Sequence, residues 1–258
     1  MPIRESTPSG APVWADLSTT DMAATQQFYT GLFGWTYDGD GTAEEYGGYV
    51  TAYLDDRKVA GLYPHMEEFG GTPNVWTVYL KSDDIAATSD AVAAAGGRIL
   101  TPAMHVAPFG HMAVFRDPGQ AAFGGWQPQE HHGFGIDSEH GAPVWHENLS
   151  KSYADTVAFY EKAFGWETSV MSDTDEFRYT TLGADDDARA GLMDASGFLP
   201  PDAPSQWITY WGLADLDASI ARATELGGSV LEAPADTPYG RMATLVDCCG
   251  ATIKVNGL

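Results

Sequence analysis

The stretch PVWHENL, residues 143–149, places His146 directly beside Glu147, and two such side chains could serve as metal ligands. The stretch reads as a β-strand, and successive side chains of a strand point to opposite faces. His146 and Glu147 would then lie on opposite faces, where they could not bind one metal ion together. Trp145 and Glu147 would share a face instead.

A second Trp-x-acid sequence occurs earlier in the chain. PVWADL, residues 12–17, places Trp14 and Asp16 where the later stretch has Trp145 and Glu147, 131 residues further on. Other pairs of segments keep this spacing until the second copy becomes one residue shorter, which identifies an internal repeat. The other matching pairs are FYTGLFGW (28–35) with FYEKAFGW (159–166), NVWTVYLKSDDI (74–85) with SQWITYWGLADL (205–216), AGGRIL (95–100) with LGGSVL (226–231), and FGHMAVFRDP (109–118) with YGRMATLVDC (239–248).

The repeat divides the chain into two domains, residues 10–126 and residues 142–258. The segment between them, residues 127–141, is polar and contains glycine, which predicts a solvated linker. Its histidines could suggest a metal-binding tract, but no acidic or Cys ligand is spaced to complete one. We therefore expect His131, His132 and His140 to be solvated.

Each copy contains the order strand, helix, strand, strand, strand twice. In the first copy, Thr20 or Asp21 can cap a helix over 21–33 that Gly34 ends, and residues 152–164 form its counterpart. The elements expected next are a hairpin around Asp55-Asp56, a strand over 74–81, a helix over 83–95, and a last hairpin over 98–126 that turns at DPGQ. The chain thus predicts an α+β fold of four βαβββ modules.

The charge balance excludes several classes of partner. The sequence has 36 acidic and 13 basic residues and a net charge of −23, and such a surface repels nucleic acid and anionic lipid. There is no long apolar run, and the polar start MPIRESTPSG is not typical of a signal peptide. The two cysteines, Cys248 and Cys249, are adjacent and build no disulfide framework. A cytoplasmic protein is the expectation.

These motifs together resemble the vicinal-oxygen-chelate superfamily, which includes glyoxalase I, bleomycin-resistance proteins and extradiol dioxygenases. PVWADLSTTDMAATQQFYTGLFGW, at 12–35, is similar to a tandem branch from actinobacteria whose members carry hydroxylase or glyoxalase-like labels. Related tandem proteins occur beside aromatic polyketide pathways. The resemblance implies that each domain rolls two modules into a curved mixed sheet around a cup. We call these the first cup and the second cup. Four modules close both cups in one chain, so a monomer or a weak homodimer is expected.

In that superfamily, a metal ion is held in the cup by three side chains. Carried over to this sequence, the resemblance places the ligand positions at residues that are poor donors. Those positions are Trp14, Thr77 and Gly124 in the first cup and Trp145, Ile208 and Lys254 in the second. A transition metal needs at least three N, O or S donors, so we expect no cofactor and no metal, which elemental analysis after chelation would test.

Strand alternation predicts which side chains face each cup instead. An aromatic wall with one carboxylate suits a flat aromatic ligand, and a desolvated acid could act as a general base. The predicted catalytic residues are Asp16 and Glu147. The predicted ligand-binding residues are Trp14, Tyr79, Gly124 and Trp126 in the first cup and Trp145, Tyr210 and Lys254 in the second.

Simple core packing explains the tryptophans equally well. Gly124 would leave room in the first cup. Glu147 could pair with Lys254, whereas Asp16 has no obvious partner, so Asp16 is the preferred functional residue. Two classes of function remain. One is a metal-free enzyme of aromatic natural-product metabolism, with a hydroxylase-, cyclase- or isomerase-type step. The other is a non-catalytic protein that sequesters or delivers a small molecule, as in drug resistance. Glyoxalase chemistry is disfavoured because it relies on the metal.

Overall fold

The computed structural model describes residues 7–38, 46–65 and 73–258. The first domain contains β1 (Pro12–Thr19), α1 (Met22–Phe33), β2 (Thr36–Tyr37), β3 (Val50–Leu54), β4 (Arg57–Pro64), β5 (Val75–Lys81), α2 (Ile85–Ala94), β6 (Arg98–Val106), β7 (Gly110–Arg116) and β8 (Ala122–Pro128). The second contains β9 (Pro143–Ser150), α3 (Tyr153–Phe164), β10 (Thr168–Asp173), β11 (Arg178–Leu182), a 3-10 turn (Asp185–Asp187), β12 (Ala190–Asp194), β13 (Gln206–Leu213), α4 (Leu216–Glu225), β14 (Ser229–Thr237), β15 (Gly240–Val246) and β16 (Thr252–Gly257).

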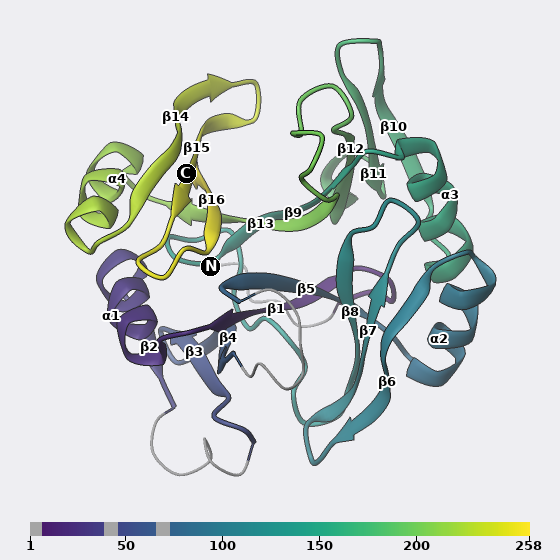
Figure 1. The fold of residues 1–258 in the computed structure, drawn as a ribbon, viewed down its shortest axis with the longest axis horizontal. Helices are drawn as coiled ribbons and strands as arrows, with labels where there is room; N and C mark the ends of the chain where they lie inside the picture. Colours follow the sequence, from purple (N-terminus) through teal and green to yellow (C-terminus); the bar gives the residue numbers. More distant parts are fainter. Residues whose placement is uncertain (1–6, 39–45, 66–72) are drawn as a thin grey trace.

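Both domains form an eight-stranded sheet with the same strand order. It is β2-β3-β4-β1-β5-β8-β7-β6 in the first domain and β10-β11-β12-β9-β13-β16-β15-β14 in the second. Strand β1 pairs in parallel with β4 and antiparallel with β5, and β9 pairs in the same way with β12 and β13, so both sheets are mixed. The predicted α+β tandem duplication of four βαβββ modules is confirmed (Figure 1).

Local sequence signals set the ends of the elements. Asp21, rather than Thr20, caps α1, because its carboxylate accepts a hydrogen bond from the Ala24 amide at 3.0 Å. Gly34 ends the helix with φ of +76°, in the left-handed region that glycine favours. The stretch 98–126 differs from the expected hairpin. It forms three strands, because a turn over residues 107–109 precedes the turn at DPGQ.

The two domains share their hydrophobic cores. One cluster joins side chains of the first module, such as Phe28 and Trp35, to Trp211 and other side chains of the fourth. A second cluster joins the second and third modules, for example Phe123 with Tyr160. Accordingly, α1 packs beside α4 and α2 beside α3 (Figure 1). Each cluster therefore depends on residues of both domains.

Two equivalent hydrogen bonds cross between the domains inside these cores. The Tyr29 hydroxyl donates to Asp247 Oδ2 at 3.0 Å, and the Tyr160 hydroxyl donates to Asp117 Oδ2, also at 3.0 Å. Both acids are buried, and burial raises the pKa of Asp117. A buried acid needs such a partner, so these bonds fix the relative position of the domains.

The segment between the domains is packed at several positions, so the prediction of a solvated linker was wrong for His131. His132 is exposed as expected, and His140 is half-buried and accepts a hydrogen bond from the Ala214 amide at 3.2 Å. His131, Phe134 and Ile136 are buried, with 9%, 4% and 2% of their surfaces exposed. The Phe134 amide donates to the Val13 carbonyl at 3.0 Å. The apolar side chains at 134 and 136 explain this burial, because the hydrophobic effect favours packing them against the domains although the rest of the segment is polar.

Among the described residues, no helix is long and apolar enough to cross a membrane.

Replacing Trp211 by Ala tests the shared core. Its ring lies 5.2 Å from the rings of both Trp35 and Trp76, so the substitution should lower the free energy of unfolding by about 3–5 kcal/mol. Urea unfolding followed by far-UV circular dichroism should still show one transition, because both domains lose the same cluster. The control is Leu231→Ala, since Leu231 is 61% exposed. Two separate transitions would contradict the shared core.

Candidate functional site in the second cup

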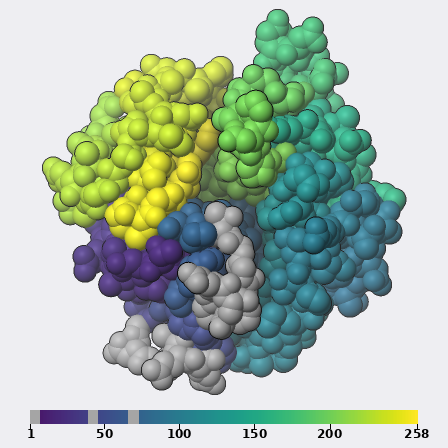
Figure 2. All heavy atoms as spheres, viewed as in Figure 1, coloured from purple at the N-terminus to yellow at the C-terminus, as the bar shows by residue number. Residues whose placement is uncertain are grey.

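The second domain contains a partly open cavity of ≈ 880 Å³. It lies over β9, β13 and β16 and is bordered by the β14–β15 hairpin and by the segment that contains Phe198. Figure 2 shows the molecular surface hollowed between the yellow-green and the green segments. Most of the lining is apolar or aromatic, and the lining side chains include Leu149, Met171, Phe177, Met193, Phe198, Pro238, Tyr239 and Met242.

The sheet register builds the floor of this cavity. Trp145 of β9 lies opposite Tyr210 of β13, and Tyr210 lies opposite Lys254 of β16, so three side chains form one row across the sheet. Glu147 is two residues beyond Trp145 and also lines the cavity. His146 lies away from it, where its Nδ1 is 3.0 Å from the Thr209 hydroxyl. The predicted alternation of this strand is confirmed.

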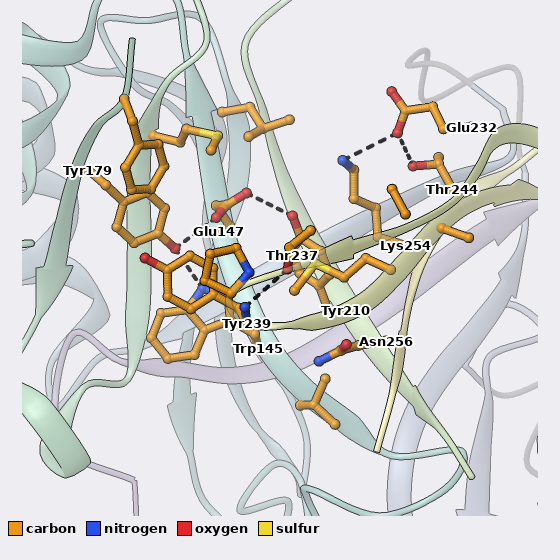
Figure 3. Close-up of a pocket in the computed structure, with 18 of the residues that line it drawn as sticks. Trp145, Glu147, Tyr179, Tyr210, Glu232, Thr237, Tyr239, Thr244, Lys254 and Asn256 are labelled. Atoms are coloured by element: carbon orange, nitrogen blue, oxygen red, sulfur yellow. Dashed lines mark hydrogen bonds and ion pairs between the residues drawn. The ribbon is translucent and has the colours of Figure 1, made fainter. Parts of the chain in front are cut away.

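Two tyrosine hydroxyls hold the carboxylate of Glu147 (Figure 3). Tyr179 donates to Oε2 at 2.7 Å and Tyr210 donates to Oε1 at 3.0 Å, while the Trp145 indole donates to the Tyr179 hydroxyl at 2.8 Å. Burial raises the pKa of Glu147, and the two hydroxyls and the nearby Lys254 only partly offset that rise. Each carboxylate oxygen keeps a lone pair with which it can accept a further proton donor.

Lys254 does not pair with Glu147, although the sequence suggested this pair. Its ammonium forms an ion pair with Glu232 at 3.6 Å, and the Thr244 hydroxyl donates to the same carboxylate oxygen. The ammonium also lies 5.8 Å from the centre of the Tyr210 ring. Glu147 accepts hydrogen bonds from the two tyrosines, whereas Glu232 on the neighbouring hairpin is exposed and pairs with the lysine.

Sequence reasoning missed Tyr179. Its hydroxyl passes over Gly191 of β12 to reach Glu147, and a Cβ at Gly191 would collide with that hydroxyl. Tyr49 and Gly61 of the first domain repeat this arrangement, each 130 residues earlier. The signal was therefore available in the repeat, as a tyrosine and a glycine conserved at one spacing between the two copies.

The first domain contains the same chain of groups around Asp16. The Trp14 indole donates to the Tyr49 hydroxyl at 2.7 Å, and hydrogen bonds from Tyr79 and Tyr49 act on the Asp16 carboxyl. Burial nevertheless raises the pKa of Asp16 to about 8. Its Oδ1 has no hydrogen-bond partner within the described parts of the chain. Asp16 thus has the tyrosine partners that its sequence context did not reveal.

The other predicted first-cup residues are packed against the interdomain segment. The His131 ring lies 4.3 Å from the Trp14 ring, and the Trp126 indole donates to the His131 carbonyl at 2.8 Å. Trp14, Tyr79 and Trp126 are 3%, 6% and 7% exposed and share one hydrophobic cluster with Phe134. The Trp14 side chain on β1 is therefore covered. Its counterpart on β9, Trp145, is half-buried and lines a cavity.

Gly124 does not leave room in the first cup as expected. The ring of Tyr79 lies directly against it, and a Cβ at this position would collide with the ring. The Tyr79 ring of the neighbouring strand β5 thus fills the space that a side chain at position 124 would occupy. The roles of Asp16, Trp14, Tyr79, Gly124 and Trp126 in ligand binding or catalysis stay predictions.

The family model of the Glyoxalase/Bleomycin resistance protein/Dioxygenase superfamily matches residues 12–123 and 149–255, once in each domain. The chain belongs to this superfamily. "Putative glyoxylase CFP32" of Mycobacterium tuberculosis is 37% identical over 257 residues, which cover 99% of this chain and 97% of the relative. Anthracycline biosynthesis protein DnrV of Streptomyces peucetius is 36% identical over 263 residues, covering 95% and 92%.

Among solved structures, the Mn(II)-bound glyoxalase from Novosphingobium aromaticivorans has a TM-score of 0.65 and 16% sequence identity, covering 96% of this chain and 82% of that protein. At this identity the likeness concerns the fold alone. Together with the tandem match to the family model, it confirms the resemblance that the sequence motifs predicted.

The residues present do not fit the metal that members of the superfamily hold in the cup. The row across the second sheet offers an indole, a phenol and an ammonium group, and Ile208 has no donor. In the described parts of the chain, no group of three or more His, Cys, Asp or Glu side chains is placed to hold a metal ion. Glu147 is instead held by two hydroxyl donors. A metal-free protein stays a prediction.

The buried carboxyl of Asp16 predicts a pH dependence of stability. Asp16 has a pKa of about 8 in the folded protein against an ordinary value of 3.8, so the folded state retains a proton that the unfolded state has lost. Stability should therefore fall as the pH rises towards 8. Burial also lowers the pKa of His131 to about 3, so His131 makes stability rise with pH instead. This rise ends near pH 6.5, the ordinary pKa of histidine. The window from pH 6.5 to 8 thus isolates the carboxyls.

Between pH 6.5 and pH 8, Asp16→Asn should reduce the decrease in the free energy of unfolding by at most about 2 kcal/mol, because the amide does not titrate. Urea unfolding at a series of pH values measures it. The raised pKa of Glu147 acts in the same direction in both proteins, so the difference between them reports on Asp16 alone. Equal slopes for the two proteins would mean that Asp16 is already ionised at pH 6.5.

Proposed function

We propose that the cavity of the second cup binds a hydrophobic small molecule with a flat aromatic ring system, without a metal ion. The size and the lining of the cavity are the main support for this proposal. Its volume of ≈ 880 Å³ lies within the range of pockets for drug-sized ligands. Aromatic side chains surround a single buried carboxylate in it, and rings with apolar faces suit a flat ligand.

Glu147 is the group that would act on such a ligand. It is 5% exposed, and burial raises its pKa, which makes the carboxylate a stronger proton acceptor. The protonated hydroxyls of Tyr179 and Tyr210 fix the orientation of the carboxylate, because their own pKa values are raised by burial and by Glu147. We propose that Glu147 accepts a proton or a hydrogen bond from a phenol or an activated C–H of the ligand.

The relatives support a setting in aromatic natural-product metabolism. DnrV, whose name places it in anthracycline biosynthesis, matches this chain over 95% of its length. Anthracyclines are built on flat fused rings, which is the shape that the aromatic wall of the second cup favours. The glyoxylase name of the mycobacterial relative weighs less, because the donor set for a catalytic metal does not fit here.

Matched tryptophan variants test which cup binds. Titration with anthracene-9-methanol should quench the tryptophan fluorescence of the unmodified protein. Trp145→Phe should weaken binding by about tenfold, because it removes a large ring and the donor to Tyr179. Trp14→Phe, at the equivalent repeat position, should leave the affinity unchanged, because His131 and Phe134 cover the Trp14 ring.

Calorimetry gives the affinity independently of the tryptophan signal, and circular dichroism checks that both variants are folded. Loss of binding in Trp14→Phe together with unchanged binding in Trp145→Phe would place the site in the first cup. Absence of binding to the unmodified protein would reject the proposed function.

A further inference from the structure

The charged side chains that line the second-cup cavity are mainly acidic. Glu147, Asp185 and Glu232 face a single basic residue, Lys254. Lys254 is already in an ion pair with Glu232. Within the described parts of the chain, neither Glu147 nor Asp185 takes part in any ion pair. The cavity therefore keeps an excess of negative charge.

Aromatic rings surround the same space. The side chains of Trp145, Phe177, Tyr179, Tyr210 and Tyr239 all line the cavity. The faces of such rings carry partial negative charge and attract cations. One cation already occupies such a place, since the Lys254 ammonium lies 5.8 Å from the centre of the Tyr210 ring. Figure 3 shows the Glu147 carboxylate between Tyr179 and Tyr210.

We infer that the ligand of the second cup is an organic cation: an apolar, aromatic molecule that carries a protonated amine or a quaternary ammonium group. The cationic group would lie at Glu147, beside the rings of Trp145 and Tyr210. This inference rests on the proposed function, and it adds the charge of the ligand to the shape that the cavity already indicates.

Other ligand charges fit the lining less well. An anionic ligand would find its donors occupied, because the hydroxyls of Tyr179 and Tyr210 donate to Glu147 and the Lys254 ammonium is held by Glu232. A neutral ligand would leave Glu147 buried without a counter-ion. A cation lowers the pKa of Glu147 and so counteracts the effect of burial. The net charge of −23 also favours the approach of cations.

Three probes that share one ring system isolate the charge. They are 9-(aminomethyl)anthracene, which is a cation at neutral pH, anthracene-9-methanol, which is neutral, and anthracene-9-carboxylate, which is an anion. Calorimetry with the full chain at one ionic strength should give at least about tenfold tighter binding of the cation than of the alcohol, and the carboxylate should bind most weakly.

Glu147→Gln should reduce the preference for the cation over the alcohol to below about threefold, since only the rings and the exposed carboxylate of Asp185 would then favour the cation. The control Glu225→Gln makes the same change at an exposed glutamate of α4 that does not line the cavity, and it should keep the full preference. Binding of the alcohol as tightly as the cation would overturn the inference and leave the proposed function standing. The inference would also fail if Glu147→Gln kept the full preference. Failure of all three probes to bind would overturn both.

Discussion

The structure depends on hydrophobic cores that neither domain can complete alone. Helix α1 of the first domain packs with the fourth module, and α3 of the second domain packs with the second module, so each core contains side chains of both repeats. Because the helices bury these faces of the sheets, the cup faces are not required for the main cores. The same constraint therefore holds the domains together and leaves two cups whose contents can differ.

The two cups have diverged from one arrangement. In each cup, a tryptophan donates a hydrogen bond to a tyrosine hydroxyl. This tyrosine and a second tyrosine form hydrogen bonds with a buried carboxyl group. In the first cup, the interdomain segment packs on Trp14, and the Tyr79 ring takes the space beside Gly124. In the second cup, Trp145 borders an open cavity and Lys254 stands in the place of Gly124. Among the described residues, the Trp14 ring of the first cup is thus covered, whereas its counterpart Trp145 borders a cavity with space for a ligand.

Much of this could be predicted from the sequence, because the decisive signals were local or repeated. The constant spacing of the repeats gave the two domains, and strand alternation placed Trp145 and Glu147 on one side and His146 on the other. The sequence could not reveal contacts that form only when distant strands and loops meet. The pairing of Lys254 with Glu232 and the burial of His131 and Phe134 are such contacts. The sequence favoured Asp16 because it suggested Lys254 as a partner for Glu147 and showed no cover over Trp14.

We propose that Glu147 and its two tyrosines form the polar end of an aromatic binding site. A crystal structure of the protein soaked with anthracene-9-methanol would test this placement. We expect electron density for the three rings beside Trp145 and Tyr210, with the hydroxyl within hydrogen-bond distance of a Glu147 oxygen. Density for the probe at Asp16 in the first cup, or a second cup filled by its own side chains, would contradict it.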